Sequence, residues 1–227
     1  MEKIIVYIAF SGILFCQEFN YKIYSLFNIP VADVKMSIKD TTIENQYSKV
    51  IDMHCKTVYI ADYLYSVNNR YKVAVDSNFN ILYFRKHINQ PNIQSFIYTT
   101  NNDSKIVYNQ TDIEIPKDTF NIFSLMYYLS VSDYESIQTH LINNQIEKDG
   151  AIYSFSLKSK QKEDWYIYDI IINEQKQGKH LIQYTDILNW GLFKKNALRR
   201  MWINYKDQKI NRCYFEYGFA YFTAYLE

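Results

Sequence analysis

The chain of 227 residues carries 25 basic and 24 acidic side chains, so its formal charge is only +1. A near-neutral chain has no global field that attracts nucleic acid or an anionic membrane. The five glycines are scattered, which excludes the glycine-rich loops that hold dinucleotides or nucleotide phosphates. The length suits one sizeable core, and 23 tyrosines and 14 phenylalanines favour β strands around a large interior.

The first residues have the order of a signal peptide. Lys3 precedes an uncharged apolar run over residues 4–15, which is too short to span a bilayer comfortably. We therefore expect residues 1–16 to be a signal peptide, cleaved after Cys16, and residues 17–227 to form a single β-rich domain that is exported to the periplasm or associated with the outer membrane. Two alternatives stay open: Cys16 is lipidated, although the bulky Phe15 precedes it, or residues 4–15 form a buried first strand.

Most of the first half of the chain alternates with period two. Apolar side chains recur at every second position, as at Val34, Met36 and Ile38. Polar turn sequences separate these runs at intervals of roughly 8 to 12 residues, which predicts an antiparallel sheet or barrel. The segment 47–65 is either one long strand or a strand followed by a helix.

Cys55 and Cys213 are the two cysteines that remain beyond residue 16. Alternation places Cys55 on the face of Met53 and Cys213 on the face of Phe215, so both thiols are expected to point inward. An even pair in an exported protein permits a disulfide between them. The alternative is two unbonded cysteines that serve as small buried hydrophobic side chains.

The middle of the chain predicts helices. After a cap at Asp118, the segment 119–129 is apolar on nearly all sides, so it must be covered and we place it inside the curve of the sheet. Ser132 and Glu135 have capping-box spacing, which predicts a second helix to about residue 142. The predicted fold is therefore mainly β, a strongly curved antiparallel sheet or half-barrel that wraps one central apolar helix. Strands resume at 151–158, 165–173, 179–184, 198–205, 210–215 and 219–226.

Several segments together carry a family resemblance. They are 19–23 leading into 29–32, the central 123–129, and a closing set formed by 201–204, Asp207, Gly218 and 224–226. In these segments the chain resembles the DUF3108 family of bacterial exported proteins over nearly all of residues 17–227. The resemblance implies a curved sheet around a helix, similar to envelope lipoprotein carriers, and no established activity. The sequence departs from the family at Ala32, where a glycine is expected, and near Ile210 and Asn211, where a proline is expected.

No arrangement of residues predicts catalysis, a metal site or a cofactor. The four histidines lie far apart, and none has the spacing of a zinc site. Paired carboxylates lie in polar, turn-like segments where nothing suggests a raised pKa. Ser124 lacks the glycine-flanked turn of a hydrolase nucleophile, and we expect its hydroxyl to bond to the preceding turn of its helix. The sequence therefore predicts a protein that is not an enzyme.

The aromatic residues suggest a site for a hydrophobic or lipid-like ligand in a β cavity. Arg199 and Arg200 belong to a basic cluster that would form a rim for an anionic head group, although alternation puts these two side chains on opposite faces. Peripheral membrane contact fits this function, whereas nucleic acid does not. The alternative is an envelope scaffolding module with a fully packed interior and tyrosines that hold a protein partner. The predicted ligand contacts are Tyr59, Tyr63, Tyr83, Phe96, Tyr98, Phe123 and Tyr127, and the predicted rim is Lys194, Lys195, Arg199 and Arg200.

Overall fold

The computed structural model describes residues 16–102, 104–109, 111–139, 144–178 and 186–227. The predicted signal peptide up to residue 15 and the predicted strand 179–184 lie outside these described residues. Within them, one 14-stranded sheet has the order β8-β7-β6-β5-β4-β3-β2-β1-β14-β13-β12-β11-β10-β9, with every neighbouring pair antiparallel.

The elements follow one another along the chain mostly as neighbours in space. The strands are β1 (Cys16–Tyr24), β2 (Pro30–Ile43), β3 (Gln46–Thr57), β4 (Asn68–Asp76), β5 (Ile81–Gln90), β6 (Ile93–Asn102), β7 (Lys105–Tyr108), β8 (Glu114–Pro116), β9 (Gln145–Lys148), β10 (Ala151–Lys162), β11 (Trp165–Gly178), β12 (Leu198–Asn204), β13 (Lys209–Tyr217) and β14 (Ala220–Leu226). The helices are η1 (Leu26–Asn28), α1 (Tyr59–Leu64), α2 (Ile122–Val131), α3 (Tyr134–Thr139) and α4 (Ile187–Leu192).

The β2–β3 hairpin shows how local sequence sets the register. Glu44 and Asn45 connect the strands with φ of 50° and 62°. Positive φ at both central residues is what a type I′ turn requires, and this turn matches the twist of the flanking strands. The strands then pair without a shift from Ile43 opposite Gln46 to Ala32 opposite Thr57. Because a one-residue slip would turn every side chain to the wrong face, this unbroken register fixes which residues point inward.

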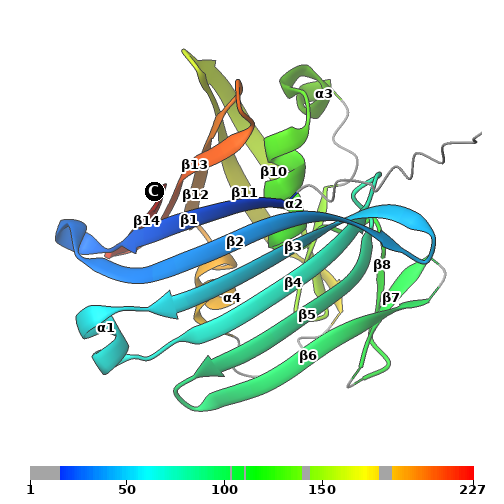
Figure 1. Ribbon diagram of the computed structural model, residues 1–227, viewed down its shortest axis with the longest axis horizontal. Coiled ribbons are helices and arrows are strands. Elements are labelled where there is room, and N and C mark those ends of the chain that lie inside the picture. The colour runs from blue at the N-terminus through cyan, green and yellow to red at the C-terminus, as the bar shows by residue number, and fades with distance from the viewer. Residues whose placement is uncertain (1–15, 103, 110, 140–143, 179–185) are drawn as a thin grey trace, which may run out of the picture.

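The sheet curls (Figure 1), and the segment 117–120 joins its two edge strands, β8 and β9. The Ile81 amide at the start of β5 donates to the Lys117 carbonyl at 2.9 Å, which holds one end of the segment. At the other end Phe120 forms a parallel bridge with Ile146 of β9, and the Glu147 amide donates to the Phe120 carbonyl at 2.7 Å. The result is a nearly closed antiparallel barrel.

Helix α2 lies inside the curve of this sheet, as the sequence predicts (Figure 1). Leu125 and Leu129 are fully buried, and the ring of Phe123 lies 4.9 Å from that of Tyr71 on β4. The predicted start is wrong: the helix begins at Ile122, and Asn121 caps it by accepting from the Ser124 amide at 2.9 Å. Residues 119 and 120 are not helical because Phe120 is used for the bridge that closes the barrel.

Two further predictions are sharpened by the structure. The segment 47–65 is a strand followed by a helix, since β3 ends at Thr57 and α1 follows. The Ser124 hydroxyl bonds to the Asn121 carbonyl at 3.1 Å, which is the predicted structural role. The second predicted helix is present as α3 but ends at Thr139, and residues 140–143 lie outside the described part of the chain.

The loops of the barrel gather at two ends of different character. We call the end that carries the turns at residues 44–45, 76–80, 163–164 and 206–208 the polar end. We call the opposite end, which carries η1, α1 and the β13–β14 turn, the aromatic end. Successive antiparallel strands run in opposite directions, so every second connection lies at the same end of the barrel.

Candidate ligand-binding site

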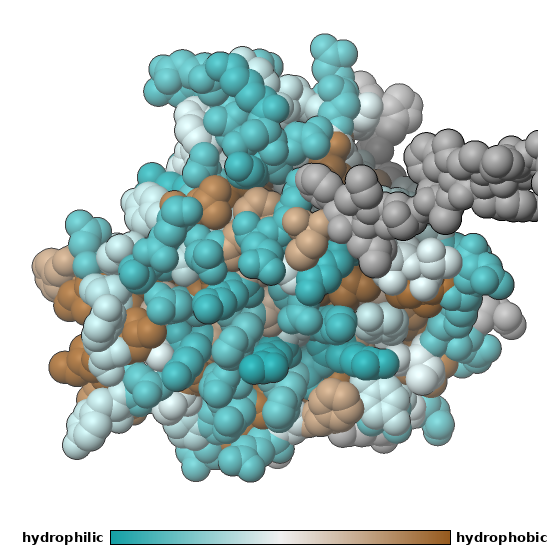
Figure 2. All heavy atoms as spheres, in the orientation of Figure 1, coloured by the Kyte–Doolittle hydropathy of each residue, from teal (hydrophilic) through white to brown (hydrophobic). Residues whose placement is uncertain are grey.

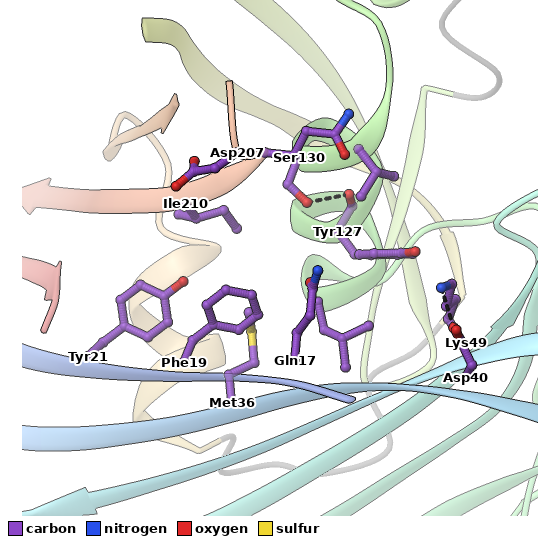
Figure 3. A pocket seen from close by; sticks show the side chains of 13 residues that line it. Gln17, Phe19, Tyr21, Met36, Asp40, Lys49, Tyr127, Ser130, Asp207 and Ile210 are labelled. Atoms are coloured by element: carbon purple, nitrogen blue, oxygen red, sulfur yellow. Dashed lines mark hydrogen bonds and ion pairs between the residues drawn. The ribbon is translucent and has the colours of Figure 1, made fainter. Parts of the chain in front are cut away.

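A row of cavities runs between α2 and the inner face of the sheet. The first, about 280 Å³, lies at the polar end among β1, β2, the β12–β13 turn and the last turn of α2 (Figure 3). The third, about 170 Å³, lies between α2, α4 and the inner face of strands that include β1, β13 and β14. The second cavity is a narrow space of about 20 Å³ between these two. It shares Tyr127 and Ile210 with the first cavity, and Phe123 and Met126 with the third. The three share wall residues in turn, and we call the row that they form beside the helix the path.

The first cavity is amphipathic and has an ion pair at its wall. Phe19 and Ile210 face Tyr127 across it, while the carboxylate of Asp40 pairs with the ammonium of Lys49 (Figure 3). Burial opposes charge on both groups, but the hydrogen bonds between them lower the pKa of Asp40 and raise that of Lys49. Both groups therefore stay ionised near neutral pH and offer a polar contact at the mouth.

The third cavity has an almost wholly apolar wall interrupted by one buried cation. Arg199 is only 4% exposed, and its guanidinium donates to the backbone carbonyls of Leu192, Lys194 and Ala197. Among the described residues no carboxylate pairs with it. Burial lowers its pKa to about 10, so it still carries its charge at neutral pH. An anionic group that entered this cavity would meet an uncompensated positive charge.

Tyr21 of β1 lines both the first and the third cavity. Its side chain is 6% exposed, and its hydroxyl has no hydrogen-bond partner among the described residues. Burial, reinforced by the neighbouring Cys213, raises the pKa of this phenol, so the group is a neutral donor. An unsatisfied buried hydroxyl costs roughly 1–3 kcal/mol. A ligand atom that accepts from it would recover that cost, which makes Tyr21 the polar point inside the row of cavities.

Cys55 and Cys213 both line the third cavity, as inward-facing residues should, yet both are free thiols. The disulfide that the sequence permits is therefore not formed. The reason lies in the strand order, because β2, β1 and β14 separate β3 from β13, whereas a disulfide brings its two Cα atoms to within about 7 Å. Burial raises the pKa of each thiol to about 12, so the two behave as small apolar side chains.

Of the seven predicted ligand contacts, the structure brings only Phe123 and Tyr127 to the cavities. Phe96 and Tyr98 lie on the outer face of β6, 52% and 36% exposed, because Ile97 and Thr99 take its inner face. Tyr83 lies on the outer face of β5, because the next residue, Phe84, takes the inner face.

Tyr59 and Tyr63 are also placed outside the barrel. They lie on α1 at the aromatic end, 71% and 90% exposed. Alternation gives the two faces of a strand but says nothing of a residue that leaves the sheet, so these two tyrosines could not be assigned to the interior from the sequence.

The predicted basic rim is also divided. Arg199 points into the barrel, whereas Arg200 points outward and donates to Asp169 on β11 at 2.8 Å. Strand alternation predicts that these two neighbouring side chains point to opposite faces. Lys194 and Lys195 lie in the segment that leads into β12, at the aromatic end. Arg199 and Arg200 both line the third cavity, Lys194 and Lys195 do not, and only Arg199 has its charge buried, so the four residues do not form a single rim.

Sequence reasoning missed a buried ionic cluster on the inner face of β5, near the middle of the strand. Lys86 is fully buried, and its ammonium lies 2.6 Å from Asp149 and in direct contact with Asp186. Asp186 also accepts from the Tyr71 hydroxyl at 2.8 Å. Burial opposes the charge on Lys86, but the two carboxylates raise its pKa. A signal was present in the sequence, because alternation puts Lys86 on the apolar face of β5.

The described residues hold neither a cluster of possible metal ligands nor a membrane-spanning helix. No three histidine, cysteine, aspartate or glutamate side chains among them gather as they would around a metal ion. No helix in the described part of the chain is long and apolar enough to cross a membrane.

Comparison with known proteins names no activity for this chain. No family model matches the sequence, and no curated protein matches it. Among solved structures, the chain is similar to the crystal structure of a beta-barrel-like protein of a domain of unknown function, DUF1849, from Brucella abortus. The two are 8% identical, with a TM-score of 0.47, and the match covers 93% of this chain and 95% of that one.

Proposed function

We propose that the protein binds a slender hydrophobic or lipid-like molecule in the row of cavities beside α2, as an exported and non-catalytic protein of the cell envelope. The observation that carries the proposal is the Tyr21 hydroxyl, which is buried without a partner between an amphipathic cavity and an apolar one. Most buried donors in folded proteins are satisfied, and this one lies at a cavity wall, where the acceptor atom of a ligand can reach it.

The chemistry of the cavities supports an amphiphile rather than a purely polar ligand. An apolar chain would gain about 25 cal/mol for each Å² removed from water against Phe123, Met126 and the other wall residues. Its polar group has two places to bind, the Asp40–Lys49 pair at the polar end and Arg199 in the third cavity. Narrow cavities in series suit one extended chain.

Export is part of the proposal and draws on the sequence alone. The support is the signal-peptide order of residues 1–16 and the resemblance to the DUF3108 exported proteins. The competing function, an envelope scaffold, calls for a fully packed interior, and the cavities beside α2 favour the binding protein instead.

Binding can be tested with a fluorescent polyunsaturated fatty acid and a variant that fills the path. Met126 lines both the narrow space and the third cavity, so Met126→Trp should block the path. Tyr98→Trp, on the outer face of β6, is the matched control. We expect the wild type and the control to enhance the fluorescence of the probe and Met126→Trp to do so at least tenfold less, with circular dichroism unchanged in all three.

A second measurement identifies the natural ligand. The protein is purified from its native envelope, extracted with organic solvent and analysed by mass spectrometry. A lipid present in stoichiometric amount supports the proposal. A wild type that does not bind the probe and yields no lipid, or that co-purifies with a protein instead, contradicts it.

A further inference from the structure

Most of the exposed large hydrophobic side chains gather at the aromatic end of the barrel. Figure 2 shows hydrophobic residues clustered over η1 and α1, at the left of the view. At the tips, Phe27 is 87% exposed, Tyr63 is 90% exposed and Phe219, in the β13–β14 turn, is 98% exposed. We call this set the aromatic tips. Its members are Leu26, Phe27, Ile29, Tyr59, Ile60, Tyr63, Leu64, Tyr217 and Phe219.

The opposite end shows that this is not a general property of the loops. The turns of the polar end carry polar residues such as Glu44, Asn78 and Lys206, and the one phenylalanine in them, Phe79, packs against Tyr127 and Tyr128. Exposed hydrophobic residues scattered singly are normal, but many of them gathered at one end mark an interaction surface. The barrel therefore has one end suited to water and one suited to a less polar surrounding.

The backbone holds two of the tips in a conformation that side chains of this kind rarely adopt. Phe27 has a φ of 60° and Tyr59 a φ of 52°, in the left-handed region. Glycine would adopt these angles without strain, so bulky aromatic residues there have an unfavourable local conformation. In both cases the conformation coincides with a side chain that projects from the end of the barrel into solvent.

Charged residues around the tips favour an anionic surface. Lys56 and Arg70 are exposed where β3 ends and β4 begins, beside α1. In the segment before β12, also at the aromatic end, Lys195 is exposed. The ammonium of Lys194 lies 5.9 Å from the ring centre of Tyr217.

Acidic groups near the tips are held by neighbours. The carboxylate of Asp62, the acidic residue of α1, accepts hydrogen bonds at 2.8 Å from Thr57 and from Ser66. Glu216 accepts from the Tyr214 hydroxyl at 2.7 Å. These hydrogen bonds leave both carboxylates charged, but the basic side chains of Lys56, Arg70, Lys194 and Lys195 outnumber them, so the charge around the tips is on balance cationic.

We propose that the aromatic tips dock the protein onto the surface of an anionic lipid bilayer. Phenylalanine, tyrosine and leucine on a basic background are the residues that settle at the boundary between head groups and acyl chains. The shape also favours a bilayer over a rigid protein. The tips are separate protrusions from three loops, and a bilayer deforms around each, whereas a protein partner would need a matching hollow for every one.

The docked end is also the end nearer the apolar cavity. The third cavity is lined by Leu188 and Leu192 of α4 and by Phe215 and Phe222 of the β13–β14 hairpin. The first cavity, with its ion pair, lies at the polar end, which a docked barrel would keep in water. Docking stands apart from the proposed function, because the aromatic tips line none of the three cavities.

Flotation with vesicles tests the proposal on the full chain. Wild type should float with vesicles of phosphatidylethanolamine and phosphatidylglycerol, and less with phosphatidylcholine or at high salt. The combined variant Phe27→Ser, Tyr63→Ser and Phe219→Ser should bind at least tenfold less. The control Tyr47→Ser with Phe96→Ser removes exposed aromatic rings from other parts of the barrel and should bind as the wild type does.

A local readout separates docking by the tips from attachment through any other segment. In a Cys16→Ser background, an environment-sensitive dye is attached at Tyr63→Cys or, as the control, at Tyr47→Cys. Vesicles should shift the emission to the blue at position 63 and leave position 47 unchanged.

Three results overturn the proposal: wild type that does not float, a combined variant that floats like wild type, or equal shifts at the two dye positions. A wild-type dimer that the same three substitutions dissociate, measured by size-exclusion chromatography, would overturn it in favour of a second copy of the chain. The Met126→Trp variant should float normally, so that failure of ligand binding and failure of docking are told apart.

Discussion

Replacement of Lys86 by methionine tests the buried ionic cluster most directly. Lys86, Asp149 and Asp186 are each no more than 1% exposed, so none of the three charges is solvated by water. Lys86→Met keeps the length of the side chain but leaves two buried carboxylates without their cation. Breaking a buried ion pair from one side costs about 3–5 kcal/mol, because the remaining charge is uncompensated. We expect the free energy of unfolding to fall by that amount.

Lys72→Met is the matched control on the neighbouring strand. Lys72 lies 3.9 Å from Asp52, with side-chain exposures of 41% and 46%, and such an exposed pair contributes at most about 1 kcal/mol. Urea unfolding followed by circular dichroism measures both variants. If Lys86→Met does not fold, the variant that adds Asp149→Asn and Asp186→Asn should recover stability. Equal losses for Lys86→Met and Lys72→Met, or no recovery in the combined variant, would refute the assignment.

Two other predictions concern buried titratable groups. Burial raises the pKa of Glu147 from 4.5 to about 7, although Tyr108 donates to it at 2.6 Å. The folded state therefore holds this proton more tightly than the unfolded chain does, and roughly 3 kcal/mol of stability should be lost as pH rises from about 4.5 through about 7. Glu147→Gln should flatten this part of the profile of unfolding free energy against pH, and an unchanged slope would contradict the shift. In the uncleaved chain, the thiols of Cys55 and Cys213, with pKa values near 12, should react with an aromatic disulfide reagent only after unfolding, whereas the exposed Cys16 should react at once. Rapid modification of all three in the folded protein would show that the third cavity is open to water.

Some of the candidate site could be predicted from local pattern. The segment around Phe123 is apolar on nearly all sides, and such a helix is stable only when it is covered, so its place inside the sheet follows from the sequence. Period-two alternation separates Arg199 from Arg200 for the same elementary reason. The pattern of β5 also contained a signal that was not used: Tyr83 shares its face with Arg85 and His87 and therefore points to solvent.

Other features depend on contacts between residues far apart in the chain. Lys86 is tolerable on an apolar face only because Asp149 and Asp186 reach it from 63 and 100 positions away, and no local window contains all three. Likewise Phe120 leaves the predicted helix because Ile146 pairs with it to close the barrel.

The sequence by itself determined the periodicity of each element, the antiparallel class of the sheet and the need to bury the helix, because these follow from side chains only a few positions apart. Only the tertiary structure decided which aromatic residues line a cavity, that Cys55 and Cys213 are separated by three strands, and that Tyr21 is left without a partner. Those outcomes depend on how strands distant in the chain are ordered and how tightly the sheet closes, and side-chain periodicity carries no information about either.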